Sequence, residues 1–187
     1  MQKYVVAARF DEETNAVLER WKRAACEAQN QIYADAAEWP PHITIAAYED
    51  VDVESLCQWT ALCASKCAPL DISFGSLGIF PHGKNSSKDV IYAAPANSLQ
   101  FTEFYYGFHQ KLDEFCGGYG WNYTIACGHP VFHSTIAICD KQDFACVFEK
   151  ICSILCPLKG KIIALEVYEN PKRFLYRAEL NNETAIR

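Results

Sequence analysis

The sequence lacks a long apolar run and any excess of basic residues. No stretch of its 187 residues approaches the roughly 20 apolar residues of a membrane-spanning helix. The apolar start of the chain meets acidic residues at once, unlike a secretory signal peptide. The formal net charge is −6, and a surface of that sign repels a long phosphate backbone. We therefore expect a monomeric cytoplasmic protein that binds neither a membrane nor long double-stranded nucleic acid.

The ten cysteines include no C-x-x-C pair. In a chain that is not exported, they should stay reduced. Cys63 and Cys67, like Cys152 and Cys156, are one helical turn apart, which favours small apolar side chains on buried helix faces. A zinc site, as in a metal-binding redox protein, or a reactive thiol is the alternative interpretation of these residues.

No linker rich in Gly, Ser or Pro divides the chain, so residues 1–187 should form one domain with a shared core. Hydrophobic periodicity and capping residues predict helices at about 11–30, 52–67, 97–116 and 140–156. Apolar and alternating runs predict strands at 3–10, 42–48, 69–81, 90–95, 132–139, 161–169 and 173–180. This order predicts an α+β fold of two lobes whose sheets face each other or form one cleft, followed by a loose tail over residues 181–187.

One short strand pattern occurs twice. Residues 42–47 read H-I-T-I-A-A and residues 133–138 read H-S-T-I-A-I, which agree at four of six positions. Side chains alternate along a strand, so the histidine, the threonine and the first alanine of each copy should share one face. These residues are His42, Thr44 and Ala46 in the first copy, and His133, Thr135 and Ala137 in the second. A single H-x-T is most often structural, but two copies in the same setting indicate a common site.

Two imidazoles suit displacement at phosphorus. One group must take a proton from the nucleophile while another gives a proton to the leaving oxygen, and an imidazole pKa near 6.5 allows both forms at cellular pH. Each threonine hydroxyl can donate a hydrogen bond to a phosphate oxygen on which charge builds. This chemistry requires no metal and no cofactor. We therefore predict that His42, Thr44, His133 and Thr135 are catalytic.

The sequence resembles the 2H phosphoesterase superfamily, which is named for two H-x-[ST] motifs, and within it the 2′-5′ RNA ligase-like or cyclic phosphodiesterase proteins. The likeness rests on the two motifs and on the element order over about residues 3–180. It implies a bilobal α+β fold with internal duplication, antiparallel sheets and a central cleft. It also implies hydrolysis of 2′,3′-cyclic phosphates or 2′-5′ bonds in nucleotide or RNA-end substrates. One histidine would activate water and the other would protonate the departing ribose oxygen, with the assignment of these roles left open.

A nucleotide substrate needs aromatic or apolar side chains against its base. Phe80, which ends a predicted strand, is one candidate, and Tyr48, Phe132 and Tyr168 are others. Packing in the core or at its rim is the commoner role of each such ring, because large aromatic residues dominate protein cores.

A non-catalytic nucleotide-binding or RNA-end-binding domain of the same fold is the alternative function. The intact motifs favour the enzyme, because binding alone does not need two proton carriers. A histidine-triad hydrolase would need H-x-H-x-H, whereas Thr44 and Ala46 follow His42 here. The remaining histidines are expected elsewhere: His82 in a loop near the cleft rim, His109 on the solvated flank of a helix and His129 in a loop.

Overall fold

The predicted order of strands and main helices is confirmed in the computed structural model, which describes residues 1–33, 39–82, 87–128 and 130–181. These residues form a mixed fold of helices and antiparallel strands, so the predicted α+β class is also confirmed. The predictions for His129 and for a tail over residues 182–187 fall outside the described residues.

Seven strands are present in the described part of the chain, and each corresponds to a predicted apolar or alternating run. They are β1 (Lys3–Phe10), β2 (His42–Glu49), β3 (Leu70–Phe80), β4 (Lys88–Pro95), β5 (Ser134–Asp140), β6 (Leu158–Glu169) and β7 (Arg173–Glu179). The motif histidine of the first copy therefore begins β2, whereas that of the second copy directly precedes β5.

The predicted helices correspond to α1 (Glu12–Ala28), α2 (Val53–Ser65), α3 (Leu99–Phe108) and α5 (Phe144–Ile154). The first two begin directly after aspartates. The carboxylate of Asp11 accepts a hydrogen bond from the backbone N–H of Thr14 at 2.9 Å, and that of Asp52 accepts one from Ser55 at 2.8 Å. Such bonds satisfy N–H groups that have no partner within the first turn, which is why helices begin at these residues.

The prediction that the third helix reaches Cys116 is wrong, because α3 ends at Phe108. Leu112 has a φ of 70°, a left-handed conformation that a right-handed helix cannot contain. Short helical turns follow: η1 (Asp113–Phe115), α4 (Gly117–Gly120), η2 (Trp121–Tyr123) and η3 (Ile125–Cys127). Of these, α4 and η2 pack against β2, so this segment lies beside the first motif.

One continuous sheet joins the two predicted lobes. Its strand order is β2-β1-β6-β3-β4-β5, with β7 also paired to β6. The long strand β6 makes the connection: residues 162–169 pair with β1, and residues 158–162 pair with β3. The ends of this path, β2 and β5, lie in contact with each other. The sheet therefore curls until its two motif strands meet.

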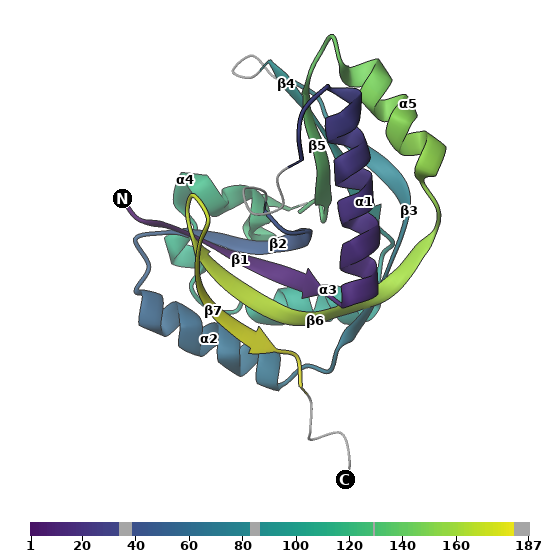
Figure 1. Cartoon of the computed structure of the whole chain (residues 1–187). Coiled ribbons are helices and arrows are strands. Elements are labelled where there is room, and N and C mark those ends of the chain that lie inside the picture. The colour runs from purple at the N-terminus through teal and green to yellow at the C-terminus, as the bar shows by residue number, and fades with distance from the viewer. Residues whose placement is uncertain (34–38, 83–86, 129, 182–187) are drawn as a thin grey trace.

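Helices cover this curved sheet on different sides (Figure 1). Helix α1 packs against α5, β5 and β6, whereas α2 packs against β6 and β7. Trp21 and Leu18 of α1, Leu56 of α2 and Ile151 of α5 are all 0% exposed. Burial of one such side chain contributes about 1.5–3 kcal/mol, so the two groups of helices hold the curl of the sheet in place.

The cysteines contribute to packing in part. None of the ten, all of which lie in the described ranges, forms a disulfide bond. Burial raises the pKa of Cys63 to about 12 and also raises that of Cys67, which makes both poor nucleophiles at neutral pH. Cys152 and Cys156 are exposed, so the prediction of a buried helix face is wrong for that pair.

Within the described ranges, no group of three or more His, Cys, Asp or Glu residues is placed to hold a metal ion. None of the described helices is long and apolar enough to cross a membrane.

Candidate active site

Both motif strands contain a β-bulge at the same position. In the pairing of β2 with β1, Ala46 lies opposite Val6 and Thr44 lies opposite Ala7, which leaves Ile45 as an extra residue. In the pairing of β5 with β4, Ala137 lies opposite Ile91 and Thr135 lies opposite Tyr92, which leaves Ile136 as the extra residue. A bulge redirects the side chains that follow it.

This bulge corrects one sequence prediction. Ala46 does not share the face of His42 and Thr44, because it packs in the hydrophobic core cluster and lines none of the hollows around the motifs. Ala137 also packs in that core cluster and is 6% exposed, with its remaining surface beside Thr135 and His42. Their C-terminal neighbours take that place. Ala47 lines a hollow with His42 and Thr44, and Ile138, which is 57% exposed, lines one with His133 and Thr135. Because of the extra residue, the side chains that follow the threonine in each strand point to the opposite faces from those that strict alternation predicts.

The two motif histidines are held by equivalent hydrogen bonds. Nδ1 of His42 lies 2.8 Å from the carbonyl oxygen of Pro40, and Nδ1 of His133 lies 2.7 Å from that of Val131. A carbonyl oxygen only accepts, so Nδ1 carries the hydrogen in each ring. In the neutral form, Nε2 is then the nitrogen that can accept a proton.

Burial lowers the proton affinity of both rings. Desolvation lowers the pKa of His42 to about 4, and the charges of Arg9, Lys22 and His133 act in the same direction. Desolvation also lowers the pKa of His133. Without an anion in the site, both rings are therefore neutral at neutral pH. A bound phosphate would supply the negative charge that favours protonation of one ring.

The four motif residues line three adjoining hollows, which together we call the cleft. The His42 hollow has a volume of about 250 Å³ and includes His42 and Thr44. The His133 hollow, of about 560 Å³, includes His133 and Thr135. The central hollow, of about 350 Å³, is lined by His42 of one motif and Thr135 of the other. The two motifs, which are far apart along the chain, therefore border one space.

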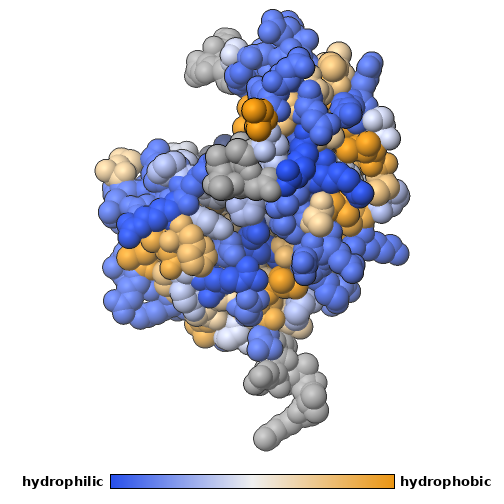
Figure 2. All heavy atoms as spheres, in the orientation of Figure 1, coloured by the Kyte–Doolittle hydropathy of each residue, from blue (hydrophilic) through white to orange (hydrophobic). Residues whose placement is uncertain are grey.

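The cleft is visible as a hollow in a molecular face whose residues are mostly hydrophilic. Figure 2 shows that this face is hollowed between the part that carries β4 and β5 and the part that carries α4. This corresponds to the ends of the curled sheet, where β2 and β5 meet. Apolar residues of the cleft, such as Ile138, thus lie where a ligand can reach them.

Of the four aromatic candidates for substrate contact, the structure places only Phe80 in the cleft. Its ring lies in the His133 hollow, stacked on Tyr92 with ring centroids 4.5 Å apart and edge-on to His133 at 4.9 Å. The ring of Tyr48 is 0% exposed, so the prediction that it contacts substrate is wrong. It faces the core because it lies beyond the bulge of β2.

Phe132 and Tyr168 pack against other aromatic side chains rather than facing the cleft. Phe132 packs against Phe101 and Tyr105, with both ring centroids 4.8 Å away. Tyr168 is 8% exposed, and its ring centroid lies 5.0 Å from that of Trp39. Neither residue lines any of the three hollows, so a direct substrate contact does not fit their positions.

Sequence reasoning missed further aromatic residues that line the cleft, among them Trp39, Tyr119, Trp121 and Tyr123. The Trp39 ring lies 5.0 Å from that of His42, and Tyr123 borders both the His42 and the His133 hollows. These residues could have been proposed from the sequence by their position: Trp39 lies just before the first motif, and the other three lie between the third helix and the second motif.

A buried ion network holds the segment before His42. The guanidinium of Arg9 donates to the carbonyl of Pro41 at 2.8 Å and pairs with Glu166 at 3.2 Å. Glu166, which is 6% exposed, also pairs with Arg177 at 2.7 Å and accepts a hydrogen bond from Tyr168. Since both cations share one buried carboxylate, the Pro41 carbonyl is held in place from within the sheet.

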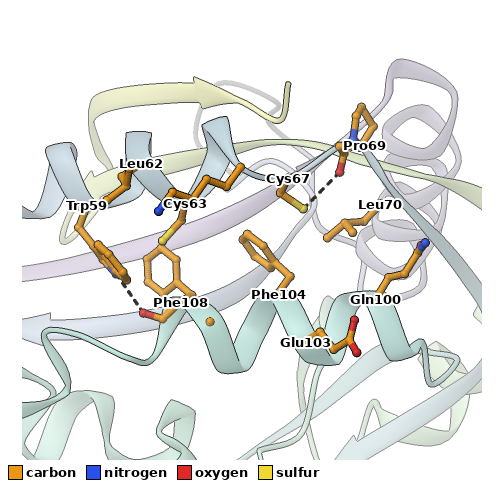
Figure 3. A pocket seen from close by; sticks show the side chains of 13 residues that line it. Trp59, Leu62, Cys63, Cys67, Pro69, Leu70, Gln100, Glu103, Phe104 and Phe108 are labelled. Atoms are coloured by element: carbon orange, nitrogen blue, oxygen red, sulfur yellow. Dashed lines mark hydrogen bonds between the residues drawn. The ribbon is translucent and has the colours of Figure 1, made fainter. Parts of the chain in front are cut away.

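A hollow larger than each of the three that form the cleft lies elsewhere. It has a volume of about 610 Å³ and lies between α2 and α3, lined by side chains such as Trp59, Phe104 and Phe108 (Figure 3). It contains no histidine and shares no residue with the cleft. The smaller hollows around the motifs carry two imidazoles, the side chains best suited to exchange a proton near neutral pH, so they are the candidate active site.

Comparison with known proteins agrees with this geometry. The family model of the 2′-5′ RNA ligase superfamily matches residues 10–172, which include both motifs. The crystal structure of TT0787 from Thermus thermophilus has a TM-score of 0.58 at 15% identity, covering 98% of this chain and 100% of that one. LigT of E. coli in its apo form has a TM-score of 0.55 at 13% identity, covering 97% and 98%.

These two structures show a shared fold at low sequence identity. No curated protein matches this chain in sequence. The family assignment depends on the match over residues 10–172, which covers most of the chain. The chain belongs to the 2′-5′ RNA ligase superfamily of 2H phosphoesterases.

Proposed function

We propose that the protein is a metal-independent phosphodiesterase that hydrolyses 2′,3′-cyclic phosphates or 2′-5′ phosphodiester bonds of nucleotides or RNA ends. Family membership supports a phosphoesterase-type function. The observation that carries the finer proposal is the matched setting of His42 and His133. Both rings border the cleft, both donate from Nδ1 to a carbonyl oxygen, and both keep Nε2 for proton transfer.

The proposed reaction needs one neutral ring and one protonated ring. The neutral imidazole accepts a proton from water at Nε2 while the water oxygen bonds to phosphorus. The imidazolium donates its Nε2 proton to the departing ribose oxygen as the bond between that oxygen and phosphorus breaks. A cyclic phosphate thereby opens to a phosphate monoester, and the sum of protons on the two rings is unchanged.

The threonines are proposed to stabilise the transition state. Thr44 lies in the His42 hollow, and Thr135 lies in both the central and the His133 hollows. A hydroxyl donor aimed at a non-bridging oxygen is worth most where negative charge develops during the reaction. Each threonine would therefore act on turnover more than on substrate affinity.

The His133 hollow suits an uncharged nucleobase. Its lining, which includes Phe80, Trp121, Asn122 and Ile138, contains no Lys, Arg, Asp or Glu among the described residues. Trp121 is 51% exposed, and its indole offers a stacking surface at the mouth of the hollow. The amide of Asn122 can both donate to and accept from the edge of a base. The net charge of −6 further favours a small ligand, acted on by a monomer, over long nucleic acid.

The competing proposal is a non-catalytic domain that binds nucleotides or RNA ends. A panel of nucleoside 2′,3′-cyclic phosphates and of 2′-5′ and 3′-5′ dinucleotides, assayed with EDTA present, separates the two. We expect turnover of a cyclic phosphate or of a 2′-5′ dinucleotide, unaffected by the chelator. Tight binding of these ligands without any hydrolysis would support the binding domain instead, and activity only without EDTA would contradict metal independence.

A further inference from the structure

A third histidine contacts the first motif strand. His109 directly follows α3 and is only 6% exposed, so the prediction that it lies on a solvated helix flank is wrong. Its Nε2 lies 3.0 Å from the carbonyl oxygen of Ile45, and its Nδ1 lies 2.7 Å from Oδ1 of Asp113. The ring of Tyr105 covers it at a centroid distance of 4.4 Å.

Both nitrogens of this ring face acceptors. A carbonyl oxygen only accepts, so Nε2 carries a hydrogen and donates it to Ile45. The Asp113 carboxylate contacts the other ring nitrogen, so contacts at both nitrogens fix the orientation of the ring.

The contact falls on the bulge of β2. Ile45 is the extra residue in the pairing with β1 and directly follows Thr44. Because the bulge interrupts the regular ladder, its carbonyl needs another partner to keep one orientation. His109 supplies that partner from a different element, 64 residues away in sequence.

The end of α3 is itself anchored. The indole N–H of Trp59 on α2 donates to the carbonyl of Phe108 at 2.9 Å (Figure 3). Phe108 is 1% exposed and immediately precedes His109. The histidine thus extends from a helix terminus that is fixed by packing and by a hydrogen bond.

We propose that the His109–Asp113 pair is a positioning device for the first motif, which holds the Ile45 carbonyl so that Thr44 stays aimed into the cleft. This inference rests on the proposed function for its effect on turnover, but its effect on the strand is independent of it. His109 does not line the cleft, and it acts on the reaction only through the backbone of β2.

Two substitutions separate the contacts of this ring. His109→Gln places an amide N–H near the position of Nε2 and can keep the bond to Ile45, whereas His109→Asn places one near Nδ1 and can keep only the contact with Asp113. We expect His109→Asn to lower kcat by about 10-fold or more with KM within about 3-fold, since small misplacements of catalytic groups are costly. His109→Gln should stay within about 3-fold of wild type in both kcat and KM, because it keeps the hydrogen bond to the Ile45 carbonyl.

Backbone amide exchange supplies a readout without substrate. In His109→Asn, exchange at residues 44–46 should rise about 10-fold or more over that in His109→Gln, with the rest of the sheet unchanged. His82→Gln is the matched control, because His82 also pairs with an aspartate, Asp89 at 3.0 Å, but its side chain is 40% exposed and is not in the cleft.

Unchanged exchange at residues 44–46 in His109→Asn would overturn the positioning role. Equal losses of turnover in His109→Asn and His109→Gln would also overturn it, as would amide exchange that rises equally throughout the sheet. Either result is expected of a residue that only stabilises the fold. If wild-type protein hydrolyses nothing on the panel, the proposed function fails, and the exchange measurement alone still decides whether the pair holds the bulge.

Discussion

Ile45 and Ile136 occupy the same place in two copies of one motif: each follows the motif threonine, and each is the extra residue of a β-bulge. The hydrogen bond from the histidine Nδ1 to the carbonyl two residues earlier is also repeated. The duplication therefore extends from side chains to backbone irregularity. In both strands the histidine and the threonine face the cleft, and the bulge places both residues directly after the threonine in the hydrophobic core cluster.

The bulge predicts opposite responses at neighbouring residues of β5. Ala137→Asp should lower the free energy of unfolding by at least about 2 kcal/mol, because it places a carboxylate in the core. Ile138→Asp should change it by no more than about 0.5 kcal/mol, since that position is exposed in the cleft. Urea unfolding of both variants measures this. A regular strand without the bulge would show the reverse order.

Removal of the motif hydroxyls tests transition-state stabilisation. Thr44→Val and Thr135→Val should each lower kcat by about 10- to 100-fold with little change in KM, because the shape is kept and a donor to the developing charge is lost. Steady-state kinetics on a substrate from the panel provides the measurement. Thr102→Val is the control, since that hydroxyl donates to Ser98 within the first turn of α3. An unchanged kcat in both motif variants would rule out this role.

The buried state of His42 predicts how stability depends on pH. Its folded-state pKa of about 4 lies below the ordinary 6.5, so between these values the unfolded chain binds a proton that the folded protein does not. Its contribution to stability is therefore complete above about pH 6.5 and is lost as the pH falls toward 4, with a slope of at most about 1.4 kcal/mol per pH unit.

Urea unfolding of wild type and His42→Asn across this range isolates the contribution of His42. The variant should show a smaller loss of stability between about pH 6.5 and 4 than wild type does. The contribution of His133 has the same sign and remains in both proteins. Equal slopes would show that His42 is not desolvated in the folded state.

Trp121 predicts where a base binds. Trp121→Ala should raise KM by about 5-fold or more with kcat nearly unchanged, as stacking on one aromatic side chain is worth about 1–3 kcal/mol. Tyr106→Ala is a suitable control, because Tyr106 is also exposed, at 49%, but lies on α3 and does not line the cleft. If the two variants behave alike, the base does not occupy the His133 hollow.

The sequence predicted the features that local patterns determine. Aspartate caps and helical periodicity placed α1 and α2, and apolar runs placed the strands, because these signals depend on residues close in sequence. The repeat of H-x-T also led to His42 and His133, which the curled sheet brings to one cleft.

The remaining features depend on partners that are distant in sequence. A bulge is set by register against β1 or β4, so strict alternation misassigned Ala46, Ala137 and Tyr48. The left-handed backbone at Leu112 keeps α3 from continuing to Cys116, and a leucine gives no turn signature in the sequence. His109 looked solvated because its acceptor, the Ile45 carbonyl, is a backbone atom that no sequence motif reports.

Turnover by His42→Ala and by His133→Ala, measured with EDTA on the best substrate of the panel, tests the central claim most directly. Each substitution removes one of the two proton carriers, so each should lower kcat at least about 100-fold while the protein stays folded. His82→Ala, which changes a histidine outside the cleft, should leave turnover unchanged. Hydrolysis that persists near the wild-type rate in both motif variants would contradict the two-histidine mechanism.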